Sequence, residues 1–408
     1  MPTFFYILFF YSGMIKFVFV FYGIKFPVDF TVLSVFLLFM YIFYDYILLK
    51  NKFKITKKYI LVLSFLLIFY CWIFISLLYT PSKGYSIIKA LYFSTNLIAF
   101  AYPLFVRNFN VKSFIKSMIF ISIIFALWYM RVDLNAASYI RNSPQFNVYA
   151  SFYLIASFLL GINVLICLIS QKKLFGNRRN DLIIAVVSLA LMLMIRGRGP
   201  LLFVIVILII YYIRKILLTR KKSFLLSVNG IIKTSIILFV LIFTVLIIFI
   251  RFENQILSMI TVTFDRLQLL LNGVEHKNAG HSVNVRLEHL TKSVNLIFNN
   301  IANFFAGYGI GSYGILTTGK DIKDYPHNIL LEIFVELGLI GLISFLLYLF
   351  FNFIYYKKHN LYISYYLILF VLLNMLKSSS LVDIRIYFTF FALFLINPKK
   401  NILKADEN

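Results

Sequence analysis

The segment AGYGIGSYGILTTGKDIKDYPHNILLEIFVELGLIG, residues 306–341, joins a glycine-rich stretch to a short polar loop and then to a long apolar helix. On both sides of it, the chain consists largely of apolar runs. The protein contains five histidines, and only His327 lies where a polar loop meets an apolar helix. We therefore expect any chemistry to be centred here.

The composition places the chain among membrane proteins. Of its 408 residues, 62% are hydrophobic and 13% are charged, which excludes a soluble globular domain. The two cysteines, Cys71 and Cys167, fall inside apolar runs. Their placement argues against a disulfide framework or a cysteine-ligated metal site.

Apolar runs of membrane-spanning length occur along most of the chain. About 20 such residues cross about 30 Å of hydrocarbon. By that measure we identify spans near 4–22, 30–49, 59–79, 86–106, 114–130, 147–170, 182–195, 200–213, 231–250, 328–353, 361–376 and 384–396. The first run carries Lys16 and lacks a small-residue cleavage site, so we interpret it as a span and not as a removed signal peptide. We predict an all-α, polytopic transmembrane helical bundle, with residues 1–408 forming one integral membrane domain.

The net charge of +25 is distributed in a way that predicts topology. Of the 40 Lys and Arg residues, 22 lie in the six segments 50–58, 107–116, 172–179, 214–222, 357–358 and 399–404. If the apolar runs are spans, these segments share one side of the membrane, as the positive-inside rule requires. We therefore predict that both termini are cytoplasmic. We also favour topology and anionic-lipid contact over nucleic-acid binding as the role of this charge.

Residues 251–325 form a predicted extracytoplasmic loop that is too long to be a simple connector. The loop carries Arg266 and an amphipathic helical pattern. Its apolar positions are Leu287, Leu290, Val294, Ile297, Ile301 and Phe304, and its polar stripe is Ser282, Arg286, His289 and Ser293. We interpret this pattern as a helix on the outer membrane surface whose polar side faces a cavity.

The sequence RGRGP, residues 196–200, interrupts a short apolar hairpin. The outward helix, 182–195, would be only about 21 Å long. The turn would therefore stop below the outer surface and carry Arg196 and Arg198 with it. An arginine at membrane depth costs at least about 2.5–3.5 kcal/mol unless a cavity or counter-charge receives it, which favours a functional site. The alternative is that these side chains extend to the outer headgroups.

Guanidinium groups form paired hydrogen bonds to phosphate oxygens and keep their charge. A group of buried arginines beneath an external loop would therefore suit a lipid pyrophosphate. We place His327 in the first turn of its helix, after Asp324 as the candidate N-cap, where the helix dipole favours a neutral imidazole. A neutral imidazole can take a proton from an attacking hydroxyl. The alternative is that His327 only caps the helix or forms a hydrogen bond.

Other polar positions near His327 share one helical face, since Asn328, Glu332 and Glu336 follow at a spacing of four. We expect them to line the same cavity. The glycines Gly307, Gly309, Gly311 and Gly314 lack a nucleotide-binding context, so we favour a tight turn that approaches a helix or the substrate. Gly338 and Gly341 indicate close helix packing. The histidines lack zinc-ligand spacing, and we expect no metal site and no cofactor.

Four motifs in this order resemble the O-antigen ligase/polymerase family of Wzy-type polysaccharide polymerases and lipopolysaccharide O-antigen ligases. They are the R-G-P hairpin, the arginine in HSVNVRLEHL, the turn GYGIGSYG and the helix PHNILLEIFVELGLIGL. The likeness covers roughly residues 140–395. It implies a metal-independent GT-C glycosyltransferase with an undecaprenyl-pyrophosphate-linked glycan as donor.

The same resemblance implies site roles. Arg198 and Arg286 would bind the pyrophosphate, and His327 would activate or position the acceptor hydroxyl. Arg141, in RNSPQFNVYA, lies near an Asn-Pro-like element of the family that here reads Ser-Pro-Gln. The full set of candidate substrate-binding residues is Arg196, Arg141, Arg266, His289, Asn328 and Glu332.

These observations predict a polysaccharide polymerase at the outer face of a bacterial plasma membrane. Its expected partners are an undecaprenyl-pyrophosphate-linked oligosaccharide, membrane lipids and a chain-length regulator, without nucleic acid. An O-antigen ligase that transfers the glycan to lipid A-core is the first alternative. A lipid-linked glycan flippase or a small-solute transporter is the second, although alternating access usually comes with repeated halves.

Overall fold

The computed structural model describes residues 2–24, 28–48, 57–106, 108–136, 146–170, 172–195, 197–219, 281–355 and 364–396. Within these ranges all regular structure is helical. The helices are α1 (Pro2–Phe21), α2 (Phe30–Phe43, followed by a π-helical turn Tyr44–Leu48), α3 (Lys57–Ser76), α4 (Tyr85–Phe105), α5 (Val111–Ala136), α6 (Phe146–Ile169), α7 (Arg178–Met194), α8 (Arg198–Thr219), α11 (His281–Phe298), α12 (Ile301–Ala306), α13 (Ser312–Thr318), α14 (Ile329–Ile354), α15 (Tyr365–Ser378) and α16 (Arg385–Leu395).

Seven of the described helices are long and apolar enough to cross a membrane. These spans are Pro2–Phe21, Phe30–Ile47, Lys57–Ser76, Tyr85–Phe105, Val111–Val132, Phe152–Ile169 and Ile329–Ile354. Two shorter apolar helices, α15 and α16, coincide with further predicted spans. The predicted span 231–250 lies outside the described residues, as do Arg141, Arg196 and Arg266.

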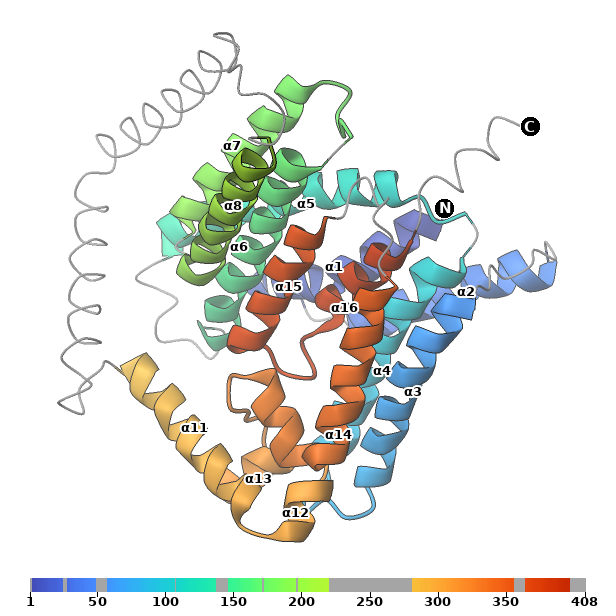
Figure 1. Cartoon of the computed structure of the whole chain (residues 1–408), viewed down its shortest axis with the longest axis vertical. Coiled ribbons are helices and arrows are strands. Elements are labelled where there is room, and N and C mark those ends of the chain that lie inside the picture. The colour runs from blue at the N-terminus through green and yellow to red at the C-terminus, as the bar shows by residue number, and fades with distance from the viewer. Residues whose placement is uncertain are drawn as a thin grey trace. The chain divides into compact units, whose positions relative to one another are not determined.

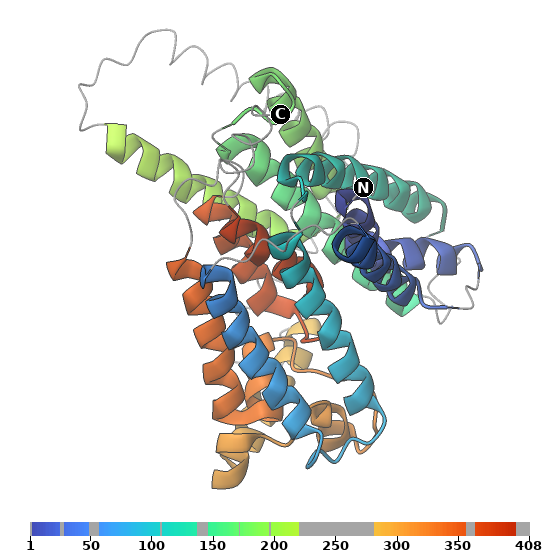
Figure 2. The same ribbon diagram turned by 90° about the vertical axis from the view of Figure 1, so that its right-hand side faces the viewer.

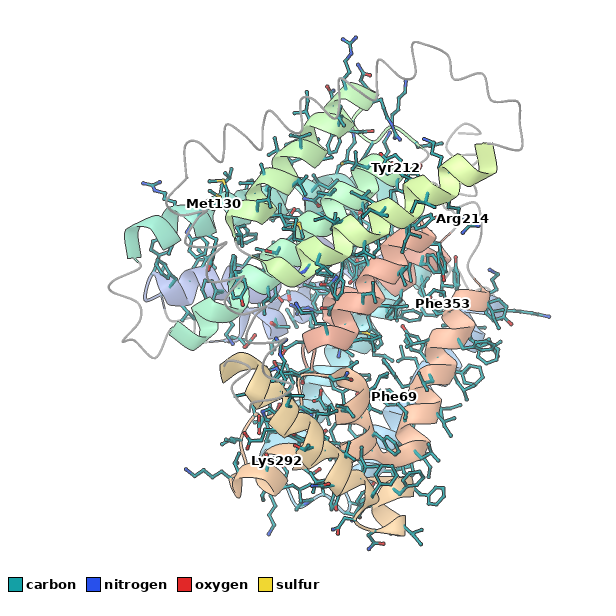
Figure 3. The ribbon with its side chains drawn as sticks, turned by 60° about the vertical axis from the view of Figure 1, so that its left-hand side comes forward. Phe69, Met130, Tyr212, Arg214, Lys292 and Phe353 are labelled. Carbon is teal, nitrogen blue, oxygen red and sulfur yellow. The ribbon has the colours of Figure 1, made fainter. Side chains whose placement is uncertain are left out.

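The chain divides into two compact units. Unit 1 comprises Met1–Leu208 and Leu296–Asn408, and unit 2 comprises Ile209–Asn295. In unit 1, α3 packs against α4 and α14, and α4 packs against α16 (Figures 1 and 2). Phe69 of α3 is fully buried in this bundle, with ring centroids 5.2 Å from Phe345 and 5.4 Å from Phe93 (Figure 3). Buried aromatic pairs of this kind contribute about 0.5–1.5 kcal/mol beyond the area that they bury.

Helix α14 is broken at Gly338, whose backbone angles are φ 64° and ψ −167°. This conformation is essentially restricted to glycine. The break frees carbonyls from the helical pattern, and neighbouring segments supply donors. Tyr308 N donates to Val335 O (3.0 Å), Gly309 N donates to Glu336 O (2.7 Å), and the Trp72 indole donates to Leu337 O (2.8 Å). Three carbonyls before the break therefore have donors from other segments, as an apolar environment requires of non-helical backbone in a membrane span.

The glycine-rich turn fits into this break. A Cβ added to Gly307 would lie 2.4 Å from the backbone of Glu336, and one added to Gly338 would lie 2.3 Å from Phe305 O. Gly309 approaches Thr80 at 2.5 Å by the same construction. The prediction of a turn that closely approaches a helix is confirmed. Gly338 is a close-packing position as predicted, and it also creates the kink.

The amphipathic pattern predicted between Leu287 and Phe304 is divided between two helices. Helix α11 ends at Phe298, and α12 begins at Ile301. Asn300 separates them because its side-chain oxygen accepts a hydrogen bond from Ala302 N at 3.0 Å and so caps α12. The expectation of one continuous helical pattern through Phe304 is therefore wrong.

Candidate functional site

His327 lies in the polar segment that leads into α14, immediately before the helix cap. Asn328 is the N-cap, and its side-chain oxygen accepts from Leu330 N (2.9 Å) and Leu331 N (3.3 Å). The predicted N-cap, Asp324, instead accepts a hydrogen bond from the Thr317 hydroxyl at 3.0 Å. The placement of His327 in the first helical turn is therefore wrong, and the helix starts two residues later. Pro326 accounts for part of the delay, because it disfavours helical geometry at the residue before it.

The backbone of His327 has a positive φ of 55°, which is uncommon for a residue with a side chain. Its imidazole packs against the Tyr325 ring with centroids 4.6 Å apart. Both side chains are partly exposed. The imidazole thus packs against Tyr325 and remains accessible near the N-terminal end of α14, as a residue that contacts a substrate would require.

A fully buried ionic cluster involves Glu332 and Glu336, which lie about one and two helical turns after Asn328. The Lys89 ammonium, from α4, contacts Glu332 and both carboxylate oxygens of Glu336, the latter at 2.8 Å. All three side chains have 0–1% relative exposure. Glu332 also accepts from the Ser380 hydroxyl (2.8 Å) and Leu381 N (3.0 Å).

Glu336 connects the same cluster to the glycine-rich turn, because it accepts from Gly311 N at 2.9 Å. Each carboxylate oxygen therefore has a donor, which is the condition for keeping buried charges. Glu332 is used in this network, and its substrate-binding role stays a prediction. Sequence reasoning missed Lys89, although a lysine and a Glu pair inside predicted spans is a signal, since such residues are rarely placed there without a partner.

The turn between α3 and α4 is bonded to the segment that precedes His327. The Asp321 carboxylate accepts from the Ser82 hydroxyl (2.6 Å) and from Gly84 N (2.8 Å). The bond from Ser82 and the backbone amides lower the pKa of Asp321 below its ordinary value. In the same region the Tyr79 hydroxyl donates to Ala306 O at 2.7 Å, and burial raises the pKa of Tyr79 to about 12.

The predicted break in the 182–213 hairpin is confirmed, because α7 ends at Met194 and α8 begins at Arg198. The turn packs closely on two neighbouring helices. A Cβ on Gly197 would lie 1.9 Å from the Ser157 hydroxyl oxygen of α6, and one on Gly199 would lie 1.5 Å from Lys377 Nζ of α15. Sequence reasoning missed Lys377, which is visible only as a basic residue at the end of an apolar run.

The segment between α15 and α16, residues 379–384, connects these features within unit 1. At one end it follows Lys377, which contacts the α7–α8 turn. Its centre donates two hydrogen bonds to Glu332 near the start of α14, and its Asp383 pairs with Lys323 at 3.1 Å. The turn where α8 begins and the loop that carries His327 therefore border the same short segment.

In unit 2, α11 carries the other predicted site residues. Arg286 is exposed, and His289 is partly exposed. The Ser293 hydroxyl donates to His289 O at 2.6 Å. Lys292 pairs with Glu288 at 2.7 Å and lowers the pKa of that carboxyl (Figure 3). The roles assigned to Arg286 and His289 stay predictions.

A comparison with protein-family models gives a match over residues 183–346, to the family described as O-antigen ligase. This match supports the resemblance to the O-antigen ligase/polymerase family that the sequence motifs indicate. A search of curated proteins found no match. The apolar helices and the family together identify a multi-pass membrane protein with glycosyltransferase-like activity.

The O-antigen ligase match contains the α7–α8 turn, α11, the glycine-rich turn and the first part of α14. It therefore includes Arg198, Arg286 and His327. Two residues that contact these elements lie outside it, namely Lys89 of α4 and Lys377 of α15. The residues that contact the α7–α8 turn and α14 thus come in part from helices that precede and follow the matched segment.

Proposed function

We propose that this protein is a polysaccharide polymerase of the O-antigen ligase/polymerase family that acts at the outer face of the bacterial plasma membrane. The observation that carries the proposal is that one short connection between α15 and α16 follows Lys377, which contacts the α7–α8 turn, and contains Asp383, which pairs with Lys323 of the loop before His327. Twelve spans, cytoplasmic termini and a GT-C architecture belong to this proposal.

The proposed reaction transfers a glycan between two lipid-linked units. A sugar hydroxyl of one repeat unit attacks the anomeric carbon of the growing chain, and the bond to undecaprenyl pyrophosphate breaks. His327 takes the proton of the attacking hydroxyl, a role worth about 10²–10⁴ in rate. Arg198 and Arg286 stabilise the negative charge that develops on the leaving pyrophosphate. The donor is already activated, so the proposal includes no nucleotide and no metal.

A ligase that transfers the finished glycan to lipid A-core is the second candidate, because the matched family model is described as O-antigen ligase. The two candidates differ in the acceptor that they need. A polymerase extends purified lipid-linked repeat units without another acceptor, whereas a ligase produces nothing until lipid A-core is added. In cells, loss of a polymerase leaves single repeats on the acceptor, and loss of a ligase removes all transfer.

The test is extension of a purified lipid-linked repeat unit by the purified protein in the presence of EDTA. We expect long chains from the native protein. Arg198→Ala, Arg286→Ala and His327→Ala should each lower the rate by about 10²–10³ without loss of the folded protein. Lysine should replace either arginine poorly, because it lacks the forked geometry.

Lys292→Ala is a matched control for Arg286→Ala, because Lys292 is an exposed cation on the same helix. It should retain the native rate. Native chain lengths in both arginine variants would contradict the assigned pyrophosphate role. No extension by the native protein, combined with transfer to lipid A-core, would replace the polymerase assignment with the ligase one.

A further inference from the structure

Arg385 is the first residue of α16, and its guanidinium group forms no hydrogen bond to a described residue. The Nε atom is fully enclosed and has no partner in the described part of the chain. The guanidinium group also takes part in none of the salt bridges between described residues. Buried polar groups nearly always have a partner, and an unsatisfied one needs an explanation.

The carboxylates that act on Arg385 from a distance already have cationic partners. They belong to Asp29, which pairs with Lys16 of α1, and to Asp383, which pairs with Lys323 at 3.1 Å. Three cations therefore share two carboxylates in this part of unit 1. The cation without a close counter-charge is Arg385.

The guanidinium group lies beside the central part of α1. Its Cζ is 4.9 Å from the centroid of the Phe9 ring, and its Nη2 would be 3.5 Å from a Cβ added to Gly13. Both residues belong to the membrane-spanning helix Pro2–Phe21. A charged side chain at this depth costs at least about 2.5–3.5 kcal/mol, whereas a cation–π contact contributes only about 0.5–2 kcal/mol. The aromatic contact therefore does not account for the position of this charge.

The space beside Gly13 is open. Gly13 is exposed, although its chain neighbours Ser12 and Met14 are buried. Apart from these chain neighbours and the backbone of α1, the only heavy atom within 4 Å of a Cβ built there is Nη2 of Arg385. The Arg385 side chain is itself only partly buried. A ligand therefore has access to the guanidinium group over Gly13.

We propose that Arg385 binds a phosphate group of a lipid in the open space beside Gly13. A guanidinium group can pair with two phosphate oxygens at once and keeps its charge. The phosphate comes either from a lipid-linked glycan, as pyrophosphate, or from an anionic phospholipid of the bilayer. The inference goes beyond the proposed function, because neither lipid has to react at Arg385.

The experiment measures lipid binding to the purified protein by native mass spectrometry. The probes are undecaprenyl pyrophosphate, phosphatidylglycerol and, as a control without a phosphate group, undecaprenol. Arg385→Gln should weaken binding of a phosphate-bearing lipid about tenfold or more, because hydrogen bonds between charged groups are lost. Arg385→Lys should restore part of the affinity, since it keeps the charge but lacks the forked geometry. Binding of undecaprenol should not change.

Gly13→Leu is the second variant, and it leaves the guanidinium group in place. Its side chain fills the space beside Arg385, so it should weaken lipid binding as Arg385→Gln does. Leucine has a higher helix propensity than glycine and Gly13 is exposed, so this variant should fold. The matched control is Lys292→Ala, which removes an exposed cation that pairs with Glu288 and should bind every lipid as the native protein does.

The Tm of the lipid-free protein separates a ligand site from a structural contact. Arg385→Gln removes a charge without a close counter-charge, so it should not lower this Tm. An added phosphate-bearing lipid should raise the Tm of the native protein and have little effect on the Tm of Arg385→Gln. A lower Tm in the lipid-free variant, together with native lipid binding, would overturn the inference.

The lipid whose binding is weakened identifies the source of the phosphate. A loss confined to undecaprenyl pyrophosphate would assign the site to a lipid-linked glycan, and a loss confined to phosphatidylglycerol would assign it to a bilayer phospholipid. Equal affinity for both lipids in the native, Arg385→Gln and Gly13→Leu proteins would overturn the inference, even if the native protein extends repeat units. Conversely, a native protein that binds a lipid through Arg385 but extends nothing would keep the site and remove the polymerase assignment.

Discussion

The glycine-rich turn and the α7–α8 turn both rely on glycines for close approach. They differ in whether the polar groups around them have hydrogen-bond partners. Around the glycine-rich turn, three carbonyls before the break in α14 accept hydrogen bonds from other segments, and the carboxylates of Glu332 and Glu336 have donors as well. Around the second, the Ser157 hydroxyl has no partner among the described residues, and Lys377 lies against a helix N-terminus. Conspicuous glycine motifs can therefore be structural, while a less conspicuous turn borders a buried hydroxyl without a partner among the described residues.

This comparison predicts that changes near α14 act through stability, because the carboxylates of Glu332 and Glu336 and three backbone carbonyls there already have donors. The largest effect is expected for Gly338→Ala, because the added Cβ would lie 2.3 Å from Phe305 O and the backbone conformation is restricted to glycine. We expect a loss of more than about 4 kcal/mol. The measurement is the amount of folded protein and its Tm in detergent.

Gly319→Ala is the control for this variant. Gly319 also has a positive φ, 72°, but no atom lies within 4 Å of a Cβ built there. It should lose only about 1–2 kcal/mol, the cost of the left-handed conformation. Equal losses of stability in Gly338→Ala and Gly319→Ala would show that the steric contact at the α14 break does not add to the destabilisation.

The next largest effect is expected for Lys89→Met. This change removes the cation and leaves two buried carboxylates, which typically costs about 3–5 kcal/mol. Adding Glu332→Gln and Glu336→Gln should recover part of the Tm, because the charge is then removed with its partners. Thermal unfolding in detergent measures both steps, and a triple variant less stable than Lys89→Met would exclude this account of the cluster.

Asn328 allows a sharper distinction between structure and substrate contact. Asn328→Ala should lower stability by about 1 kcal/mol through loss of the N-cap, and Asn328→Asp should preserve it because an oxygen remains. Extension assays on the aspartate variant then test the predicted substrate-binding role. Native activity of Asn328→Asp would show that Asn328 acts only as the helix cap. Low activity of this variant at native Tm would support a substrate contact through the amide nitrogen of Asn328.

The smallest effect is expected for Asp321→Asn, at a surface-exposed carboxylate. Its pKa is lowered in the folded protein, so its contribution is present above the ordinary pKa of 3.8 and is lost as the pH falls below that value. The native protein should lose a small part of its Tm in this range, and the variant should lose less. Identical pH dependence would show that the bonds from Ser82 and Gly84 do not contribute.

The features predicted correctly from the sequence were those set by local pattern. The helices from α1 to α6, the break before Arg198 and the close approach of the glycine-rich turn all follow from apolar run length, Gly-Pro chemistry and missing side chains. The split between α11 and α12 was missed because the apolar period continues through Asn300, while its capping hydrogen bond overrides that period.

The missed site residues depend on contacts between distant parts of the chain. Lys89 meets Glu336 across 247 positions, and Lys377 of α15 meets Gly199 of α8, which lies far earlier in the chain. No periodicity in one segment can indicate such a pair. The local signal is limited to a charged residue inside or beside an apolar run, which identifies a candidate without identifying its partner.

The break in α14 has a consequence for the order in which the bundle assembles. The indole of Trp72 and the carbonyl of Leu337 are 265 positions apart, and α3 is synthesised long before α14. An unpaired carbonyl in hydrocarbon costs several kcal/mol, so α14 cannot reach its final state in lipid alone. It must find α3 and the glycine-rich turn after insertion, and a chain that fails to do so would stay exposed to membrane proteolysis.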